Sequence, residues 1–201
     1  MRKVRVNTFL TLDGVMQAPG GPEEDPSGGF AHGGWSVGYW DDTMGQVMRA
    51  FMTPPFDLLL GRRTYEIFAA YWPTSTADGA DALNAAHKYV ASRTLKTLTW
   101  KDSSLLEGDV PDAVRELKAG SGPDIQVHGS GDLMQTLLEH GLIDEFQLCV
   151  FPVVLGSGKR LFADGAVPAG LRTLDTQTSG TGVVVARYEP AGEVKSGSFA
   201  G

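Results

Sequence analysis

One turn of the sequence combines glycine, arginine and a hydroxyl group in an arrangement that suits a phosphate. Gly61 ends a short apolar run, and Arg62, Arg63 and Thr64 open the helical pattern that follows. Two arginines in the first turn of a helix are unfavourable, because the helix dipole already makes that end positive, so we expect a negative group to offset their charge. A bound phosphate would do so through charge-assisted hydrogen bonds. The alternative, that both side chains point to water, fits these residues equally well.

Two further turns have similar chemistry. The first ends a predicted strand at Ser92, Arg93 and Thr94. The second opens a predicted helix and consists of Gly129, Ser130, Gly131, Asp132 and Leu133. Glycines at a helix N-terminus let backbone N–H groups approach an anion, although a strand-to-helix turn that only needs small residues explains the second segment equally well. Three such turns at the carboxyl ends of strands indicate one ligand site, because open α/β sheets bind ligands there.

Asp41 and Asp42 are the candidate acid–base residues. A partly buried carboxylate has a raised pKa and can protonate or orient a heterocycle. The same residues, together with Thr43, offer N-cap and first-turn chemistry for the helix that follows. Capping is the stronger expectation for at least one of the two aspartates.

Several other chemistries lack the residues that they need. The four histidines have no metal-ligand spacing, so we predict no metal. Met134 stands where the dinucleotide fingerprint needs glycine, which excludes an ordinary Rossmann domain. Cys149 lies in an apolar stretch and is typical of a small buried hydrophobe. Residues 156–160 lack the spacing of a P-loop, so a basic glycine turn between strands is the favoured interpretation. Because Lys159 and Arg160 are both basic, a phosphate-binding turn stays open as the alternative.

Hydrophobic periodicity and turn residues predict strands that alternate with helices. The predicted strands are residues 4–12, 56–60, 88–92, 98–100 and 125–128. The predicted helices are residues 41–53, a segment from residue 62, and residues 78–87, 109–120 and 132–141. From residue 144 the alternation predicts a half-buried strand, and residues 171–178 and 183–188 predict a closing hairpin. Residues 15–36, rich in glycine and proline, are expected to form a lid or binding loop, or else to be disordered.

These elements predict an α/β protein with a central, mostly parallel sheet that helices cover on both faces and an antiparallel C-terminal hairpin. The chain has 201 residues, 42 % of them hydrophobic, and a net charge of -7. We expect a single domain over residues 1–190, a flexible polar tail over residues 191–201, and no attraction to nucleic acid or membranes. With no signal peptide and no apolar run long enough to span a bilayer, a cytoplasmic location is expected.

Five segments, in this order, resemble the dihydrofolate reductase superfamily, and most closely the branch similar to the C-terminal reductase domain of the bifunctional riboflavin-biosynthesis protein. They are Leu12-Asp13-Gly14, residues 60–65, residues 92–95, residues 128–133, and Asp144-Glu145 followed by residues 152–158. Each is weak alone, and their order and spacing carry the resemblance. It implies a three-layer dihydrofolate reductase-like fold that binds NADPH in an extended pose.

The resemblance also implies roles for the three turns. Gly61, Arg62, Arg63 and Thr64 would hold the pyrophosphate and the adenosine-phosphate side of NADPH. Ser92 and Arg93, with Thr94 in the same turn, would lie around the 2′-phosphate. Gly129, Ser130, Gly131, Asp132 and Leu133 would meet the pyrophosphate and the nicotinamide ribose. The residues agree with this reading, because a 2′-phosphate needs arginine where an NAD site has an acid.

By the same resemblance, the chain is expected to be a stand-alone NADPH-dependent reductase of a pteridine-like or ribosylamino-pyrimidine compound, as in riboflavin biosynthesis. Trp40 would stack on a flat heterocycle, unless it packs against the sheet edge. Phe151 and Pro152 would line the pocket, unless they simply end a strand, and Lys159, together with Arg160, would hold a sugar phosphate. Two alternatives stay open: a dihydrofolate reductase proper, and a non-catalytic NADP(H)-binding or sensing module. The family also implies a homodimer.

Overall fold

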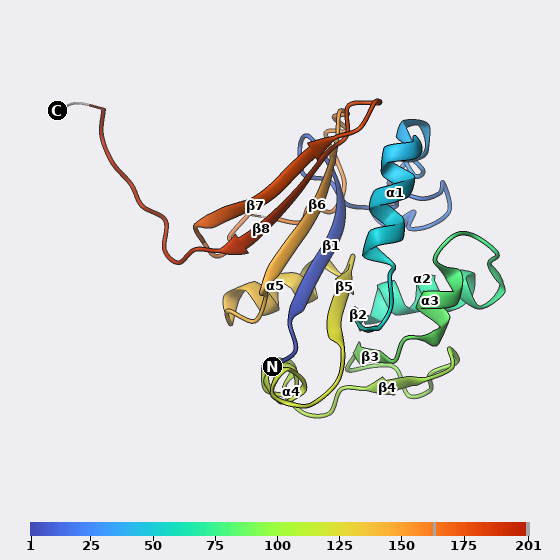
Figure 1. Cartoon of the computed structure of the whole chain (residues 1–201). Helices are drawn as coiled ribbons and strands as arrows, with labels where there is room; N and C mark the ends of the chain where they lie inside the picture. The colour runs from blue at the N-terminus through green and yellow to red at the C-terminus, as the bar shows by residue number, and fades with distance from the viewer. Residues whose placement is uncertain (163, 200–201) are drawn as a thin grey trace.

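The central layer of the protein is an eight-stranded sheet with the strand order β4-β3-β2-β5-β1-β6-β8-β7 (Figure 1). The computed structural model describes residues 1–162 and 164–199. Strands β4, β3, β2, β5, β1 and β6 run parallel to one another, whereas β8 pairs antiparallel with both β6 and β7. The predicted α/β class, with a mostly parallel sheet and an antiparallel C-terminal hairpin, is confirmed.

The strands are β1 (Val4–Thr11), β2 (Phe56–Gly61), β3 (Lys88–Ala91), β4 (Ser103–Leu105), β5 (Asp124–His128), β6 (Glu145–Phe151), β7 (Leu171–Thr178) and β8 (Val184–Pro190). The helices are α1 (Asp42–Phe51), α2 (Arg62–Tyr71), α3 (Ala80–Ala85), α4 (Val110–Ala119) and α5 (Gly131–Glu139). Within residues 15–36, the predicted lid contains one short 3-10 turn, Ser27–Gly29.

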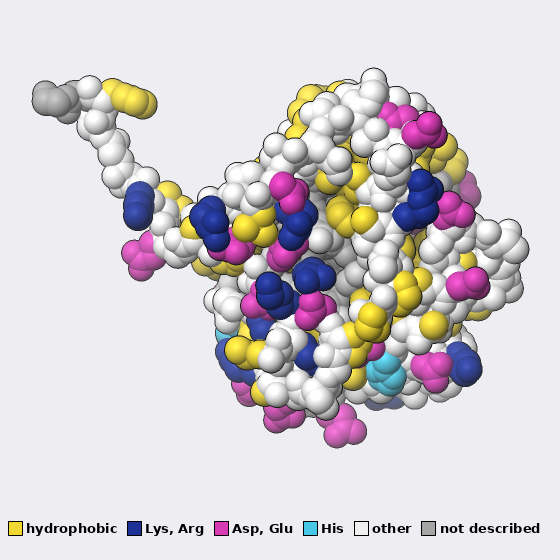
Figure 2. Space-filling model, viewed as in Figure 1, with side chains coloured by type: hydrophobic (Ala, Val, Ile, Leu, Met, Phe, Trp, Pro, Cys, Tyr) yellow, Lys and Arg dark blue, Asp and Glu magenta, His cyan; other side chains and the backbone are white. Residues whose placement is uncertain are grey.

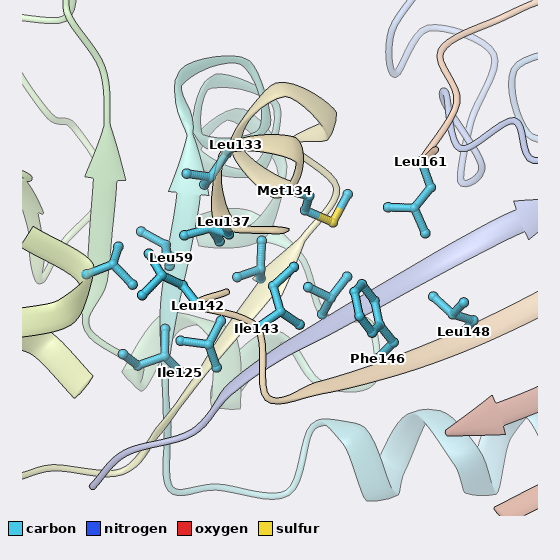
Figure 3. Packing of buried hydrophobic residues seen from close by; sticks show 14 of the residues in the cluster. Leu59, Ile125, Leu133, Met134, Leu137, Leu142, Ile143, Phe146, Leu148 and Leu161 are labelled. Atoms are coloured by element: carbon cyan, nitrogen blue, oxygen red, sulfur yellow. The ribbon is translucent and has the colours of Figure 1, made fainter. Parts of the chain in front are cut away.

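The two faces of the sheet bury separate apolar clusters. Helices α4 and α5 cover one face, where side chains from β1, β5 and β6 pack against Met134 and Leu137 of α5 (Figure 3). On the other face, α2 and α3 pack over β2 and β3 around Leu58 and Leu83. Helix α1 packs over β6 and β8 around Met44. The strip of sheet between these last two clusters, around Asn7 of β1 and Gln126 and His128 of β5, belongs to neither of them.

Two predicted elements differ from the structure. Residues 98–100 form no strand; the adjacent strand is β4, three residues further on. The Trp100 backbone N–H donates to the Tyr65 hydroxyl at 2.9 Å and its indole N–H donates to Asn84 at 2.7 Å, so side chains take up its hydrogen bonds. The helix predicted over residues 78–87 is limited to α3, because Gly79 precedes it in a left-handed conformation with φ of 87°.

Strand β6 is buried on both faces, so the prediction of a half-buried strand is wrong. The residues that alternate with its apolar side chains, Glu145, Gln147 and Cys149, are themselves buried. Glu145 is compensated by Arg187 of β8, whose Nε lies 2.7 Å from its carboxylate, and by Gln147, which donates at 3.0 Å. Alternation alone does not distinguish a solvent-facing residue from a buried one with a partner on the next strand.

The C-terminal hairpin is the most exposed part of the sheet. All residues of β7 are exposed, and among the described strands β7 pairs only with β8. Acidic and basic side chains alternate over this side of the molecule (Figure 2), with Arg172 beside Glu189 and Arg187 beside Asp175. Ala191 and Gly192 still form backbone hydrogen bonds with Gly170, and the residues that follow, up to residue 199, extend away from the sheet (Figure 1). Residues 200–201 of the predicted tail lie outside the described residues.

We expect Cys149 to be chemically inert in the folded protein. The side chain is fully buried, and burial raises the pKa of its thiol to about 12, so the reactive thiolate is scarce at neutral pH. An aromatic disulfide reagent such as DTNB should not react with the native protein but should titrate one thiol after unfolding in guanidinium. Rapid reaction of the native protein would contradict this placement.

Candidate functional site

A large cleft opens on the face of the sheet that carries α1 and α2. Its volume is about 2630 Å³, and its walls come from the lid, α1, α2 and the turns after β2, β3 and β5. The structure brings the three predicted phosphate turns together in this cleft. The lining residues from these turns are Gly61, Arg62, Arg63, Thr64, Ser92, Arg93, Thr94, Gly129, Ser130, Gly131, Asp132 and Leu133.

The turns after β2 and β5 interlock through a serine hydroxyl. Ser130 Oγ accepts the Gly61 N–H at 2.9 Å and donates to Thr64 Oγ1 at 2.8 Å. A Cβ at Gly61 would lie 3.1 Å from Ser130 Oγ. Gly129 has a φ of 57°, and a Cβ there would lie 3.2 Å from Thr64 Oγ1. Glycine is therefore needed on both turns to let the two backbones approach each other.

The helices that begin at these two turns have uncapped N-termini. No side chain caps α2 or α5, whereas Asp41 caps α1 and Asp109 caps α4. The first N–H groups of a helix have no intrahelical acceptor, and the helix dipole gives that end partial positive charge. The cleft thus receives two helix ends whose donors suit an anion.

The basic side chains of the cleft differ in whether a carboxylate already pairs with them. Arg62 pairs with Glu66 one turn along α2, at 2.9 Å. Arg63 pairs with Asp25 at 3.0 Å, and Lys159 pairs with the same aspartate. In contrast, no described residue forms an ion pair or side-chain hydrogen bond with Arg93.

Asp25 fastens the lid across the mouth of the cleft. Its side chain is 8 % exposed and contacts Arg63, Lys159 and the hydroxyl of Ser27. Burial alone would raise the pKa of Asp25, but the hydrogen bonds from Lys159, Ser27 and Arg63 outweigh it and lower the pKa to about 2. The carboxylate therefore stays ionised at neutral pH, and one lid residue neutralises cations from two different walls.

Two other polar side chains fix the base of the lid. Gln17 donates to the carbonyl groups of Asp25 and Ser27, both at 2.9 Å, and accepts the Lys159 N–H at 3.0 Å. Asp13 accepts hydrogen bonds from Thr11 and from the backbone of residues 155 and 156. These bonds, the first from the Thr11 hydroxyl, lower the pKa of Asp13 to about 2. The sequence had no periodicity in this loop that could mark Gln17 or Asp25.

The structure places Asp41 and Asp42 outside the residues that line the cleft. Asp41 caps α1 by accepting the Met44 N–H at 2.8 Å, and it accepts the Thr181 N–H at 3.1 Å. These backbone hydrogen bonds, first that of Met44, lower the pKa of Asp41. The capping interpretation is thus confirmed for Asp41, and the expectation of a raised pKa is wrong for it.

The residues predicted to contact substrate fall into two groups. Trp40 and Lys159 line the cleft. Phe151 is fully buried beneath the rings of Phe9, Trp35 and Tyr39, and Pro152 does not line the cleft either. Phe151 is the last residue of β6, so the alternative interpretation, that it ends a strand, is confirmed.

No described helix is long and apolar enough to cross a membrane. In the described part of the chain, no group of three or more His, Cys, Asp or Glu side chains is arranged to hold a metal ion.

The fold and the cleft define a dihydrofolate reductase-like α/β protein, and comparison with known proteins agrees. The RibD C-terminal domain family matches residues 2–185. The chain therefore belongs to the RibD C-terminal domain family, a family of reductases. The family resemblance predicted from the sequence is confirmed.

Three individual proteins that resemble the chain are 28 % identical to it or less. The chain is 28 % identical over 192 residues to the uncharacterized protein YyaP of Bacillus subtilis (strain 168), covering 93 % of this chain and 94 % of YyaP. Among solved structures, it resembles a Shewanella sp. PV-4 protein whose name refers to riboflavin biosynthesis, with a TM-score of 0.67, 19 % identity, and coverage of 94 % and 98 %. It also resembles a pyrimidine reductase-like protein from Corynebacterium diphtheriae, with a TM-score of 0.63, 13 % identity, and coverage of 94 % and 92 %. At these identities the two structures show the fold.

Replacing Asp25 with asparagine should loosen the lid. The variant keeps the size of the side chain but removes the charge that pairs with Arg63 and Lys159, which should lower the free energy of unfolding by about 1–3 kcal/mol. Limited proteolysis within residues 15–36 and thermal denaturation would measure the effect. Glu23→Gln is the matched control, because it removes an exposed acid of the same loop. Equal behaviour of the two variants would show that Asp25 does not hold the lid.

Proposed function

We propose that this protein is an NADPH-dependent reductase of a flat nitrogen heterocycle, of the pteridine or ribosylamino-pyrimidine type. The observation that carries the proposal is the convergence of two uncapped helix N-termini, those of α2 and α5, with Arg93 in one cleft. A helix N-terminus binds phosphate through backbone N–H groups, and a dinucleotide pyrophosphate is the anion that a reductase of this family would place there.

Arg93 supports NADPH over NADH as the cofactor. It lines the cleft at the carboxyl end of β3, and no carboxylate among the described residues competes for it. Ser92 shapes this turn by accepting the backbone N–H groups of Thr94 and Leu95 at 3.2 and 3.0 Å. A preformed turn with an unpaired guanidinium suits a 2′-phosphate, whereas an NAD site would have an acid that binds the ribose hydroxyl.

The remaining parts of the cleft support reduction in a site from which water is excluded. When bound, the dinucleotide supplies a hydride, and the protein supplies orientation and a dry pocket. Trp40, Met48, Phe68 and Trp72 give the walls apolar and aromatic surface that suits a flat ring. The lid, fastened by Asp25, forms one wall of the cleft and would limit the access of water to a bound ring. Lys159 already pairs with Asp25, so a role with a sugar phosphate requires exchange of that partner.

The pyrimidine branch is better supported than a dihydrofolate reductase proper. By the family resemblance, the latter carries its acid at the start of the helix that follows the lid. Asp41 and Asp42 occupy that place, and neither of them lines the cleft. The link to riboflavin biosynthesis comes from the names of the family and of one structural neighbour. The substrate and its pathway therefore remain part of the proposal.

Replacing Arg93 with alanine should selectively weaken NADPH binding. Loss of a charge-assisted hydrogen bond to the 2′-phosphate should raise the Kd for NADPH about 10- to 100-fold and leave the Kd for NADH nearly unchanged. Titration of tryptophan fluorescence, checked by calorimetry, would measure both. Arg115→Ala is the control, because Arg115 is an exposed arginine of α4 that does not line the cleft. If the wild-type protein binds neither dinucleotide, the reductase proposal is wrong.

We also propose that the protein is a homodimer and that β7 contributes to the interface. An edge strand with its hydrogen-bonding groups free can pair with another chain, and β7 also exposes Leu171 and Leu174. Light scattering after size-exclusion chromatography should give twice the chain mass for the wild type and a shift towards monomer for Leu174→Glu. A wild-type monomer at high concentration would contradict the proposal.

A further inference from the structure

Three polar side chains lie together at the floor of the cleft, in the strip of sheet left between the two apolar clusters; Asn7 and His128 line the cleft, and Gln126 bonds to both of them. Asn7 of β1 and Gln126 and His128 of β5 are all buried, with exposed fractions of 6, 6 and 8 %. The parallel register of β1 and β5 places Asn7 opposite His128, and Gln126 lies two residues before His128 on the same face of β5. Burying polar groups is unfavourable unless they are hydrogen-bonded, so the pairing of each atom matters.

Their hydrogen bonds determine which atoms face one another. Gln126 Nε2 donates to the Phe51 carbonyl at 2.7 Å, so Gln126 Oε1 is turned towards the other two side chains. Oε1 accepts from Asn7 Nδ2 at 3.0 Å, and His128 Nε2 lies 2.9 Å from the same oxygen. Because this oxygen can only accept, the proton of the imidazole must be on Nε2.

This arrangement leaves two acceptors without a donor, one on Asn7 and one on His128, while each amide NH2 keeps a second N–H beside the one that it donates. Asn7 Oδ1 is buried and has no hydrogen-bond partner among the described residues. His128 Nδ1 is unprotonated by the preceding argument, and no described residue donates to it. Burial lowers the pKa of His128 to about 4, so the ring stays neutral at neutral pH and Nδ1 remains an acceptor. An unsatisfied buried acceptor costs about 1–3 kcal/mol, which a ligand donor could recover.

The surroundings of these acceptors favour an uncharged planar ligand. Asn7 and His128 both line the cleft, and the Phe68 ring lies 6.2 Å from the His128 ring. No carboxylate among the described residues hydrogen-bonds to the three floor residues. The floor therefore has no group that would favour a cation strongly, and its bare acceptors disfavour an anionic edge.

We propose that Asn7 Oδ1 and His128 Nδ1 form an acceptor site for the N–H edge of an uncharged flat ring, and so determine which ligand enters this reductase. The inference rests on the proposed function, because the ring belongs either to the heterocyclic substrate or to the carboxamide-bearing nicotinamide of the cofactor. Both present N–H donors. An N-methylated ring of the same shape lacks them and should be rejected.

The test measures binding of small probes by ligand-observed NMR, without any dinucleotide. One pair of probes is uracil and its doubly N-methylated analogue; the other is nicotinamide and its N,N-dimethyl analogue. Asn7→Leu removes the acceptor, and Gln147→Leu is the matched control, because Gln147 is a buried amide on the adjacent strand that does not line the cleft. Thermal denaturation of each variant is measured in parallel.

The wild type and Gln147→Leu should bind the N–H form of one pair about tenfold more tightly than the methylated form, which corresponds to about 1.4 kcal/mol. Asn7→Leu should abolish that preference. It removes an unpaired buried oxygen but also the hydrogen bond from Asn7 Nδ2 to Gln126, so the two effects oppose each other and the melting temperature should stay close to that of the wild type. Loss in the uracil pair identifies the substrate as the ligand, and loss in the nicotinamide pair identifies the cofactor.

Two results would overturn the inference. One is a wild-type protein that prefers neither N–H form, a comparison that needs no variant to fold. The other is an Asn7→Leu variant with a lower melting temperature and unchanged preferences, which would make Asn7 a structural residue. Either can occur while NADPH still binds and Arg93→Ala still weakens it, so failure here is distinguishable from failure of the proposed reductase function.

Discussion

The site depends on the parallel pairing of β2 with β5 and on the hydroxyl group of Ser130 at the end of that pair. Parallel neighbours end at the same edge of a sheet, so the turns that follow them must meet. Ser130 Oγ accepts from the Gly61 backbone and donates to Thr64, which fixes the distance between two helix N-termini. The Gly61 N–H and the Ser130 hydroxyl are thus used within the two turns. The N–H groups in the first turns of α2 and α5 remain available to bind an anion.

The same sheet also explains why the cleft has both polar and apolar surface. Helices α1 and α2 cover different strands of one face, around Met44 and Leu58, and neither apolar cluster includes the strip between them around Asn7 of β1 and His128 of β5. On the opposite face the same two strands are fully packed beneath α5. Residues of β1 and β5 therefore alternate between a continuous core and the floor of the cleft. This alternation lets Val6 stabilise the fold while its neighbour Asn7 faces the ligand space.

Much of this arrangement could be predicted from the sequence, because strands and helices with clear periodicity lie in the order that the family requires. The glycine turns at Gly61 and Gly129 were identified by their residue types. What the sequence could not show depends on tertiary contacts. Residue Glu145 is buried because Arg187 of another strand neutralises it, and Asp25 fastens the lid through partners 38 and 134 residues away. No local pattern encodes such pairs. The capping role of Asp41 was predictable, whereas its distance from the cleft was not.

The ion pairs of Asp25 bear on how phosphate recognition is divided among the basic residues. Arg63 and Lys159 are neutralised by one buried carboxylate, so a phosphate that contacts either of them must displace Asp25 or share the cation with it. Their contribution to affinity is then the difference between two similar charge-assisted interactions, which is small. Among the described residues, Arg93 has no such competitor, and no side chain caps the N-terminus of α2 or α5. The strongest discrimination between dinucleotides should therefore come from the turn after β3, while Arg63 and Lys159 couple ligand binding to the position of the lid.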